Sequence, residues 1–259
     1  PPAIEREGDV TYANRWAALR TFAAALDAES FAVDAATAVV IDLDKTLLGA
    51  RGRNDALIDR ARLRALRMSV AELLGARFDA AQFEHIYRAV DTPRFHPLTA
   101  DNQDYVGYLC VMVAGGVCTL SDLAALADSG GGGGLLRSVE ELCAASGWPS
   151  REIGEFHASF ARAAAAGDPT PFKGFRRREF AETAALMGRL PEDSGAERAL
   201  REAIVLTGEV WQAAEGWRAR GALLFGLSDK PDEAAFPTPA DAARGLLPLH
   251  RIRTLIVGE

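Results

Sequence analysis

The sequence predicts an α/β protein in which a parallel sheet is interrupted by a long helical stretch. Short apolar runs at residues 37–42, 222–227 and 253–258 have the length and composition of buried strands. Between the first two runs, from about residue 55 to 205, nearly every periodic stretch has helical spacing. Because strands that alternate with helices are typical of parallel sheets with right-handed crossovers, we expect the three strands to share one parallel sheet.

Composition excludes several classes of protein. The chain has 259 residues, 49% hydrophobic and 25% charged, as in an ordinary soluble globular protein. Its net charge of −7 argues against nucleic acid or a membrane surface as a partner. No apolar run approaches the ~20 residues needed to span a bilayer, and the first residues, PPAIEREGDV, lack the apolar segment of a signal peptide. We therefore expect a cytoplasmic protein.

The cysteines support the same compartment. Three cysteines, Cys110, Cys118 and Cys143, are widely spaced and form no CxxC pair. This spacing predicts reduced, buried cysteines rather than a disulfide framework or a metal site.

Helical periodicity begins before the first strand. Residues 11–29 place Trp16, Leu19, Phe22 and Leu26 on one face. Further helices are predicted at 56–75, 80–90, 105–114, 121–127, 135–145, 150–166, 175–187 and 207–220, with short helical turns within 231–237 and at 241–245. Ser121 and Ser138 are predicted N-caps, and Ser138 to Glu141 matches a capping box.

The helical stretch is too long for a single crossover between neighbouring strands. We therefore expect two domains: an α/β core of residues 1–50 and 205–259, and a helical domain of residues 51–204 over the carboxyl edge of the sheet.

Two carboxylates follow the first predicted strand. Asp42 and Asp44 are two residues apart, so on an extended chain they point the same way. They leave the carboxyl end of the strand, where open α/β sheets bind ligands. Such a pair can hold a divalent cation and divide the work of nucleophile and acid/base, although two solvated aspartates in a surface loop would have the same sequence.

The segment VVIDLDKTLL, residues 39–48, resembles motif I of the haloacid dehalogenase (HAD) superfamily, an apolar strand followed by Asp-x-Asp-x-Thr. Ser228, after the apolar run ALLFGL, resembles motif II, and residues 254–259 are similar to the first half of motif IV, which ends here at Glu259. The usual second acid of motif IV is absent. The motif III cation normally lies farther along the chain, so Lys230 is a candidate substitute, and the downstream cations are Arg244, Arg251 and Arg253.

The resemblance implies a Rossmann-like HAD core with a large α-helical cap inserted between motifs I and II. It also implies a Mg²⁺-dependent phosphatase-like hydrolase that acts on a small phosphorylated metabolite. Asp42 would be the nucleophile that forms an aspartyl-phosphate, and Asp44 the acid/base.

The resemblance assigns the remaining site residues as well. Thr46, Ser228 and Lys230 would bind and orient the phosphoryl group, and Mg²⁺ would be held by Asp42, Asp44 and Glu259.

Alternatives follow from the same residues. Ser228 could instead cap a helix over residues 229–235, and Lys230 could lie in solvent. A phosphotransferase or mutase would use the same intermediate, and a non-catalytic binding protein could keep the scaffold. The sequence identifies neither the substrate nor the oligomeric state.

Overall fold

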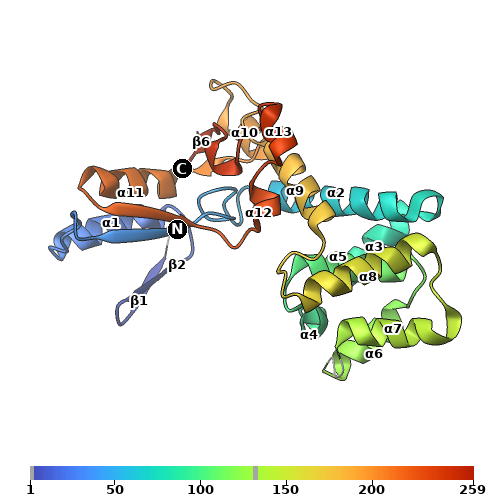
Figure 1. Ribbon diagram of the computed structural model, residues 1–259. Helices are drawn as coiled ribbons and strands as arrows, with labels where there is room; N and C mark the ends of the chain where they lie inside the picture. The colour runs from blue at the N-terminus through green and yellow to red at the C-terminus, as the bar shows by residue number, and fades with distance from the viewer. Residues whose placement is uncertain (1–2, 131–133) are drawn as a thin grey trace. The chain divides into compact units, whose positions relative to one another are not determined.

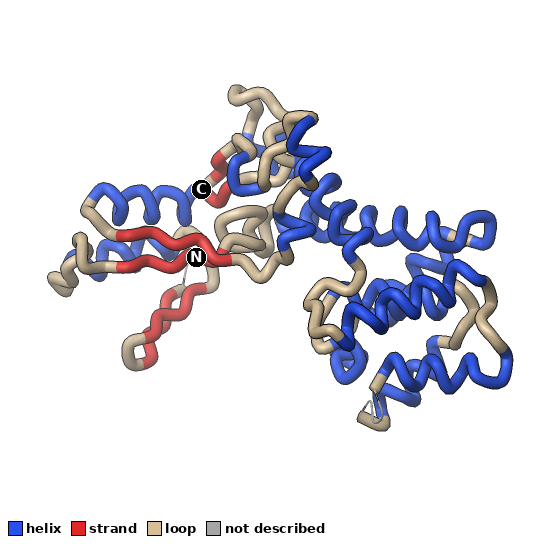
Figure 2. Tube along the Cα trace, in the orientation of Figure 1, coloured by secondary structure: helices blue, strands red, loops and turns tan. Residues whose placement is uncertain are grey.

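The computed structural model describes residues 3–130 and 134–259, and the chain divides into two compact units. Unit 1 contains Pro1–Ala61, Thr183–Lys230 and Leu247–Glu259, and unit 2 contains Arg62–Glu182 and Pro231–Leu246. The fold is mixed α/β with small parallel sheets (Figures 1 and 2), which confirms the predicted class. The bounds of the units differ from those of the predicted core and helical domain, and that domain division stays a prediction.

Unit 1 holds all the described strands and the helices next to them. Its elements are β1 (Ile4–Glu7), β2 (Val10–Ala13), α1 (Ala18–Ala28), β3 (Ala38–Asp42), α10 (Ala196–Glu202), β4 (Leu206–Thr207), α11 (Gly208–Ala219), β5 (Leu223–Leu227), the short 3-10 helix η3 (Leu249–Arg251) and β6 (Ile256–Val257), with parts of α2 (Asp55–Leu74) and α9 (Lys173–Leu186).

The central pairing of unit 1 is a parallel ladder between β3 and β5. Its register runs from Ala38 opposite Leu223 to Asp42 opposite Leu227, and Figure 2 shows the two strands side by side. These strands confirm the first two predicted runs almost residue for residue. The third run is shorter than predicted, and β6 pairs in parallel with β4 instead, Thr207 lying opposite Val257. The expectation of one three-stranded sheet is therefore wrong, because β4 is too short to leave a sequence pattern.

One face of the β3–β5 ladder is open. Val40 is 61% exposed, and Leu223 and Leu227 are each 58% exposed. The alternate residues Val39 and Ile41 are partly buried, α11 packs against β5, and α1 packs against α11. The expectation of fully buried strands is therefore wrong within the described chain, since helices cover only one face.

The N-terminal helix begins later in the chain than its helical spacing predicts. Residues 10–13 belong to an antiparallel hairpin of β1 and β2, and α1 begins only at Ala18. Gly8 sits in the hairpin turn with φ +59°, a conformation that glycine adopts without steric cost. The helical spacing of residues 11–29 therefore predicts the helix but not the residue at which it begins.

Unit 2 is helical. Besides parts of α2 and α9 it contains η1 (Gly75–Arg77), α3 (Ala80–Val90), η2 (Pro93–Phe95), α4 (His96–Thr99), α5 (Gln103–Ala114), α6 (Leu120–Asp128), α7 (Leu135–Ser146), α8 (Arg151–Ala165), α12 (Asp232–Ala235) and α13 (Pro239–Ala243). The predicted helices of this region match the observed ones to within a few residues, whereas η1, η2 and α4 were not predicted. The core is centred on α5, and Cys110, Cys118 and Cys143 are buried and free, as predicted.

The predicted caps are wrong in detail. Thr119, not Ser121, caps α6 and forms a capping box with Asp122. Ser138 lies inside α7, where its hydroxyl donates to the Gly134 carbonyl oxygen. Serine inside a helix commonly makes this backward bond, so a capping pattern alone does not fix where a helix starts. In the described chain, no helix combines the length and apolarity required to cross a bilayer.

A buried network of charges joins three helices of unit 2. Arg176 donates from Nε to Asp104 Oδ2 (2.6 Å) and from a terminal nitrogen to Glu179 Oε2 (2.8 Å). Arg62 donates to the other oxygen of Glu179 at 3.2 Å, and Asp104 accepts from the Phe172 N–H. Burial raises the pKa of Asp104, against the opposing effect of Arg176. Charges buried in this way cost stability unless every partner is present.

Replacing Arg176 should therefore destabilise the protein strongly. We expect Arg176→Met to lower the free energy of unfolding by about 3 kcal/mol, because it leaves the carboxylates of Asp104 and Glu179 buried and underpaired. Urea unfolding followed by circular dichroism measures the change. The control, Arg177→Met, removes an exposed guanidinium one residue along and should change stability by less than about 0.5 kcal/mol. Similar values for the two variants would contradict a structural role for the network.

Candidate active site

The end of β3 places Asp42 at the edge of the ladder. Asp42 is the last residue of the strand and lies opposite Leu227, so Ser228 leaves the neighbouring strand at the same edge. The Thr46 hydroxyl donates to Asp42 Oδ2 at 2.5 Å. Two of the predicted site residues, Asp42 and Thr46, are therefore in direct contact. Asp42 itself is exposed to solvent.

A tight loop connects β3 to the next segment. The Leu43 N–H donates to the Leu227 carbonyl, and the N–H groups of Lys45 and Leu48 donate to the carbonyls of Leu48 and Leu43, each at 2.8 Å. Lys45 adopts φ +58°, a left-handed conformation that costs a non-glycine residue about 1 kcal/mol or more. Its ammonium pairs with Asp59 at 2.6 Å. The loop is thus held by backbone hydrogen bonds where it leaves β3 and by the ion pair between Lys45 and Asp59.

Lys230 lies next to the second carboxylate. Its Nζ is 3.8 Å from Asp44 Oδ2, and the two side chains are 5% and 15% exposed. A lysine this well buried does not match the alternative of a solvent-exposed ammonium. The structure therefore brings Lys230 from the end of one strand to Asp44 from the end of the other.

Ser228 begins the turn that delivers Lys230. Its hydroxyl oxygen accepts a hydrogen bond from the Lys230 N–H at 3.1 Å, a turn that serine side chains commonly form. The following helix, α12, begins at Asp232 after Pro231, so Ser228 is not its N-cap. Ser228 accordingly shapes the segment after β5 rather than the start of a helix.

Glu259 is held in a different cluster. The two terminal nitrogens of Arg53 donate to the two carboxylate oxygens of the fully buried Glu209 side chain, at 2.8 and 3.0 Å. One of these nitrogens also lies 3.3 Å from Glu259 Oε1. The Glu259 N–H donates to Glu209 Oε1 at 2.8 Å. Burial by itself would raise the pKa of Glu209, but hydrogen bonds from Arg53 and Glu259, with the charge of Arg53, lower it to about 2.

The predicted metal ligands are therefore not gathered at one point. Asp42 and Asp44 leave β3 together, whereas Glu259 turns toward Arg53. Among residues 3–130 and 134–259, no group of three histidine, cysteine, aspartate or glutamate side chains is arranged to hold a metal ion.

Two residues of this region escaped sequence reasoning. Thr207 and Glu209 flank the start of α11 and are 1% and 2% exposed. An acidic residue in the first turn of a helix is favoured by the helix dipole, which is the one sequence signal for Glu209. Nothing local marks Thr207, because its partners lie far away in the sequence.

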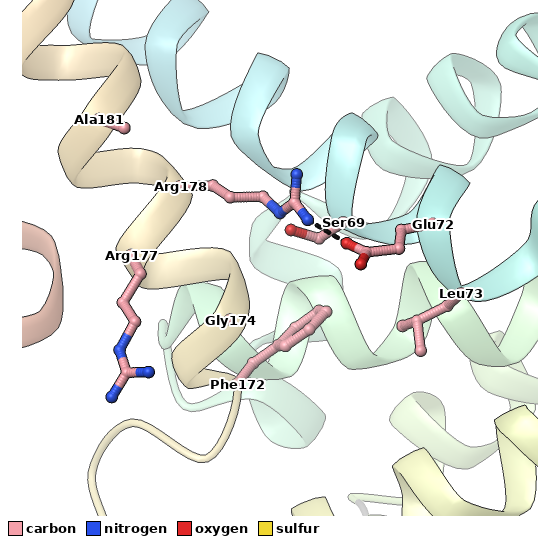
Figure 3. A pocket seen from close by; sticks show the side chains of 8 residues that line it. All are labelled: Ser69, Glu72, Leu73, Phe172, Gly174, Arg177, Arg178 and Ala181. Carbon is pink, nitrogen blue, oxygen red and sulfur yellow. Dashed lines mark hydrogen bonds and ion pairs between the residues drawn. The ribbon is translucent and has the colours of Figure 1, made fainter. Parts of the chain in front are cut away.

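Unit 2 contains a separate hollow. A cavity of about 550 Å³ lies between α2 and α9 and contains none of the predicted site residues (Figure 3). Arg178 forms an ion pair with Glu72 there, and Phe172 and Leu73 supply apolar surface. The remaining lining residues are Ser69, Gly174, Arg177 and Ala181.

Comparison of the chain with protein-family models, with curated proteins and with solved structures finds no match in any of the three. The interpretation of the site therefore depends on its own residues and geometry.

The low pKa of Glu209 predicts an acid-dependent loss of stability. A carboxylate whose pKa falls from 4.5 to about 2 on folding stabilises the protein above about pH 4.5, and this contribution disappears as the pH falls toward 2. Glu209→Gln should therefore be less stable than the parent by about 2 kcal/mol at pH 7, and the difference should shrink below about pH 4.

Thermal unfolding measured from pH 7 down to pH 3 tests this expectation. Glu215→Gln is the matched control, because Glu215 forms an ion pair with Arg218 at the surface of the same helix, where such pairs contribute little. A difference between Glu209→Gln and the parent that stays constant with pH would contradict the assigned pKa.

Proposed function

We propose that the chain is a Mg²⁺-dependent, phosphatase-like hydrolase of the HAD type, acting on a small phosphorylated metabolite through an aspartyl-phosphate on Asp42. One observation carries the proposal: four predicted site residues lie at the same edge of the β3–β5 ladder. Asp42 contacts Thr46, and Asp44 lies next to Lys230, which follows the neighbouring strand. A carboxylate nucleophile, a second carboxylate and a cation are the groups that phosphoryl transfer through a covalent intermediate requires.

The first step is attack on phosphorus. Thr46 holds Oδ2 of Asp42, which leaves Oδ1 for the new bond to phosphorus. As that bond forms, the bond from phosphorus to the leaving oxygen breaks, and Asp44 gives its proton to that oxygen. Lys230, together with the hydroxyl of Ser228, offsets the negative charge on the phosphoryl oxygens.

The second step returns the enzyme to its starting state. Asp44, now ionised, takes a proton from a water molecule, whose oxygen attacks the phosphorus of the aspartyl-phosphate. The bond between phosphorus and Asp42 breaks, free phosphate leaves, and Asp42 recovers its carboxylate.

The donors fit a magnesium ion of the usual kind. Mg²⁺ in enzymes is bound through one or two carboxylates, with water and substrate phosphate completing the shell. The Asp42 carboxylate and the backbone carbonyl of Asp44 would hold it, and it would offset phosphate charge. Glu259 would join only by leaving Arg53, from which it lies 3.3 Å away.

The remaining parts of the proposal concern the fold and the substrate. Residues 1–50 and 205–259 would form the HAD core, and residues 51–204 the helical cap that selects the substrate. A cytoplasmic location agrees with the buried, free cysteines. A binding protein without turnover is the second candidate, favoured by the contact between Glu259 and Arg53.

Removing the nucleophile should abolish phosphate release. We expect the parent to release phosphate from an aryl phosphate and from a panel of phosphate esters when Mg²⁺ is present, and Asp42→Asn to lose at least about a thousandfold in kcat. Excess chelator should stop the parent as well.

The control is Asp27→Asn, which changes an exposed aspartate of α1 that pairs with Arg220 and should keep full activity. Phosphate transfer to an added sugar faster than to water would instead favour the phosphotransferase or mutase. A folded parent that binds Mg²⁺ but turns over no ester would favour the binding protein.

A further inference from the structure

Thr207 makes two contacts with the loop that follows Asp42. Thr207 is the last residue of β4 and is 1% exposed. Its Oγ1 donates a hydrogen bond to the Thr46 carbonyl oxygen at 2.5 Å. Its N–H donates to the Leu47 carbonyl at 2.8 Å. A single buried residue from a distant part of the chain therefore binds two consecutive carbonyls of the loop.

The residue before β4 strengthens this attachment. The Gly49 N–H donates to the Val205 carbonyl at 2.9 Å, so the contacts continue along both segments. On the other side, Thr207 pairs with Val257, and a Cβ added to Gly208 would lie 2.8 Å from Gly258 Cα, so only glycine lets β6 pass so close. The Thr207 hydroxyl thus has a fixed position, held between the loop and β6.

The contact reaches Asp42 through one residue. Thr207 fixes the backbone of Thr46, and the Thr46 hydroxyl in turn donates to Asp42 Oδ2. Rotation of the Thr46 backbone would move or break that second bond and release the Asp42 carboxylate to other rotamers. In-line attack on phosphorus tolerates little such freedom, since misplacement by about 1 Å can cost about a hundredfold in rate.

We propose that Thr207 is a positioning residue for Asp42, an inference that rests on the proposed function. Its hydroxyl holds Thr46 in the orientation from which Thr46 fixes the attacking carboxylate. Thr207 itself contacts neither substrate nor the reacting atoms.

Three variants separate the hydroxyl from the packing of the side chain. Thr207→Val keeps the shape and removes the donor, whereas Thr207→Ser keeps the donor and removes a methyl group. Thr183→Val is the matched control: Thr183 is also 1% exposed, and within the described part of the chain its hydroxyl has no hydrogen-bond partner.

Two measurements are made on each variant. Steady-state hydrolysis gives kcat and KM, and hydrogen exchange reports on the amides of Leu47 and Leu48, which close the loop onto Asp42 and Leu43. We expect Thr207→Val to lower kcat by about ten- to a hundredfold with KM within about twofold, and to speed exchange about tenfold. Thr207→Ser should stay within about threefold of the parent in kcat, and Thr183→Val should match the parent.

Other results would overturn the inference. A kcat for Thr207→Val within threefold of the parent would do so, as would an equal loss in Thr207→Ser, which would assign the effect to packing. If the parent has no turnover, the proposed function fails and so does the catalytic role of Thr207. Hydrogen exchange then shows separately whether Thr207 anchors the loop, because unchanged exchange in Thr207→Val would exclude that too.

Discussion

The register of the parallel ladder between β3 and β5 is the constraint on which the candidate site depends. Asp42 lies opposite Leu227, so the segments that carry Asp44 and Lys230 leave the ladder at the same edge, although the whole helical stretch separates them in sequence. A slip of one residue would turn Asp42 to the other face of the ladder and separate Lys230 from Asp44. The chemistry proposed for the site is thus set by backbone pairing before any side chain contributes.

Buried polar contacts then fix the segments that the ladder brings together. Thr207 holds the loop after β3, while Glu209 binds Arg53 and the backbone of Glu259. The start of α11 is therefore bound both to that loop and to the residues that follow β6. Such contacts are costly to bury unless they are complete, which makes the arrangement specific. The exposed apolar face of the ladder shows that the described chain achieves this with helices on only one side.

The sequence predicts the parts of this arrangement that local pattern determines. Asp42 and Asp44 follow from an apolar run that ends in carboxylates two residues apart. Thr46, Ser228 and Lys230 are assigned only by the resemblance to the HAD motifs. The pairing of β6 with β4 could not be predicted, because a two-residue strand has no periodicity. The sequence also does not predict the buried contacts of Thr207 and Glu209, or the ion pair between Arg53 and Glu259. Each of these contacts depends on residues that are distant in sequence. The hairpin of β1 and β2 is not predicted, because the predicted helix of residues 11–29 includes most of β2.

The most direct test of the account is to trap the intermediate that it assigns to Asp42. The protein would be mixed with Mg²⁺ and a turned-over phosphate ester, quenched in acid and treated with borohydride, which reduces an acyl phosphate to an alcohol. Peptide mass spectrometry would then locate any change. The account predicts homoserine at position 42, dependent on both Mg²⁺ and ester. Unchanged Asp42 in a protein that releases phosphate, or the modification at another carboxylate, would contradict it.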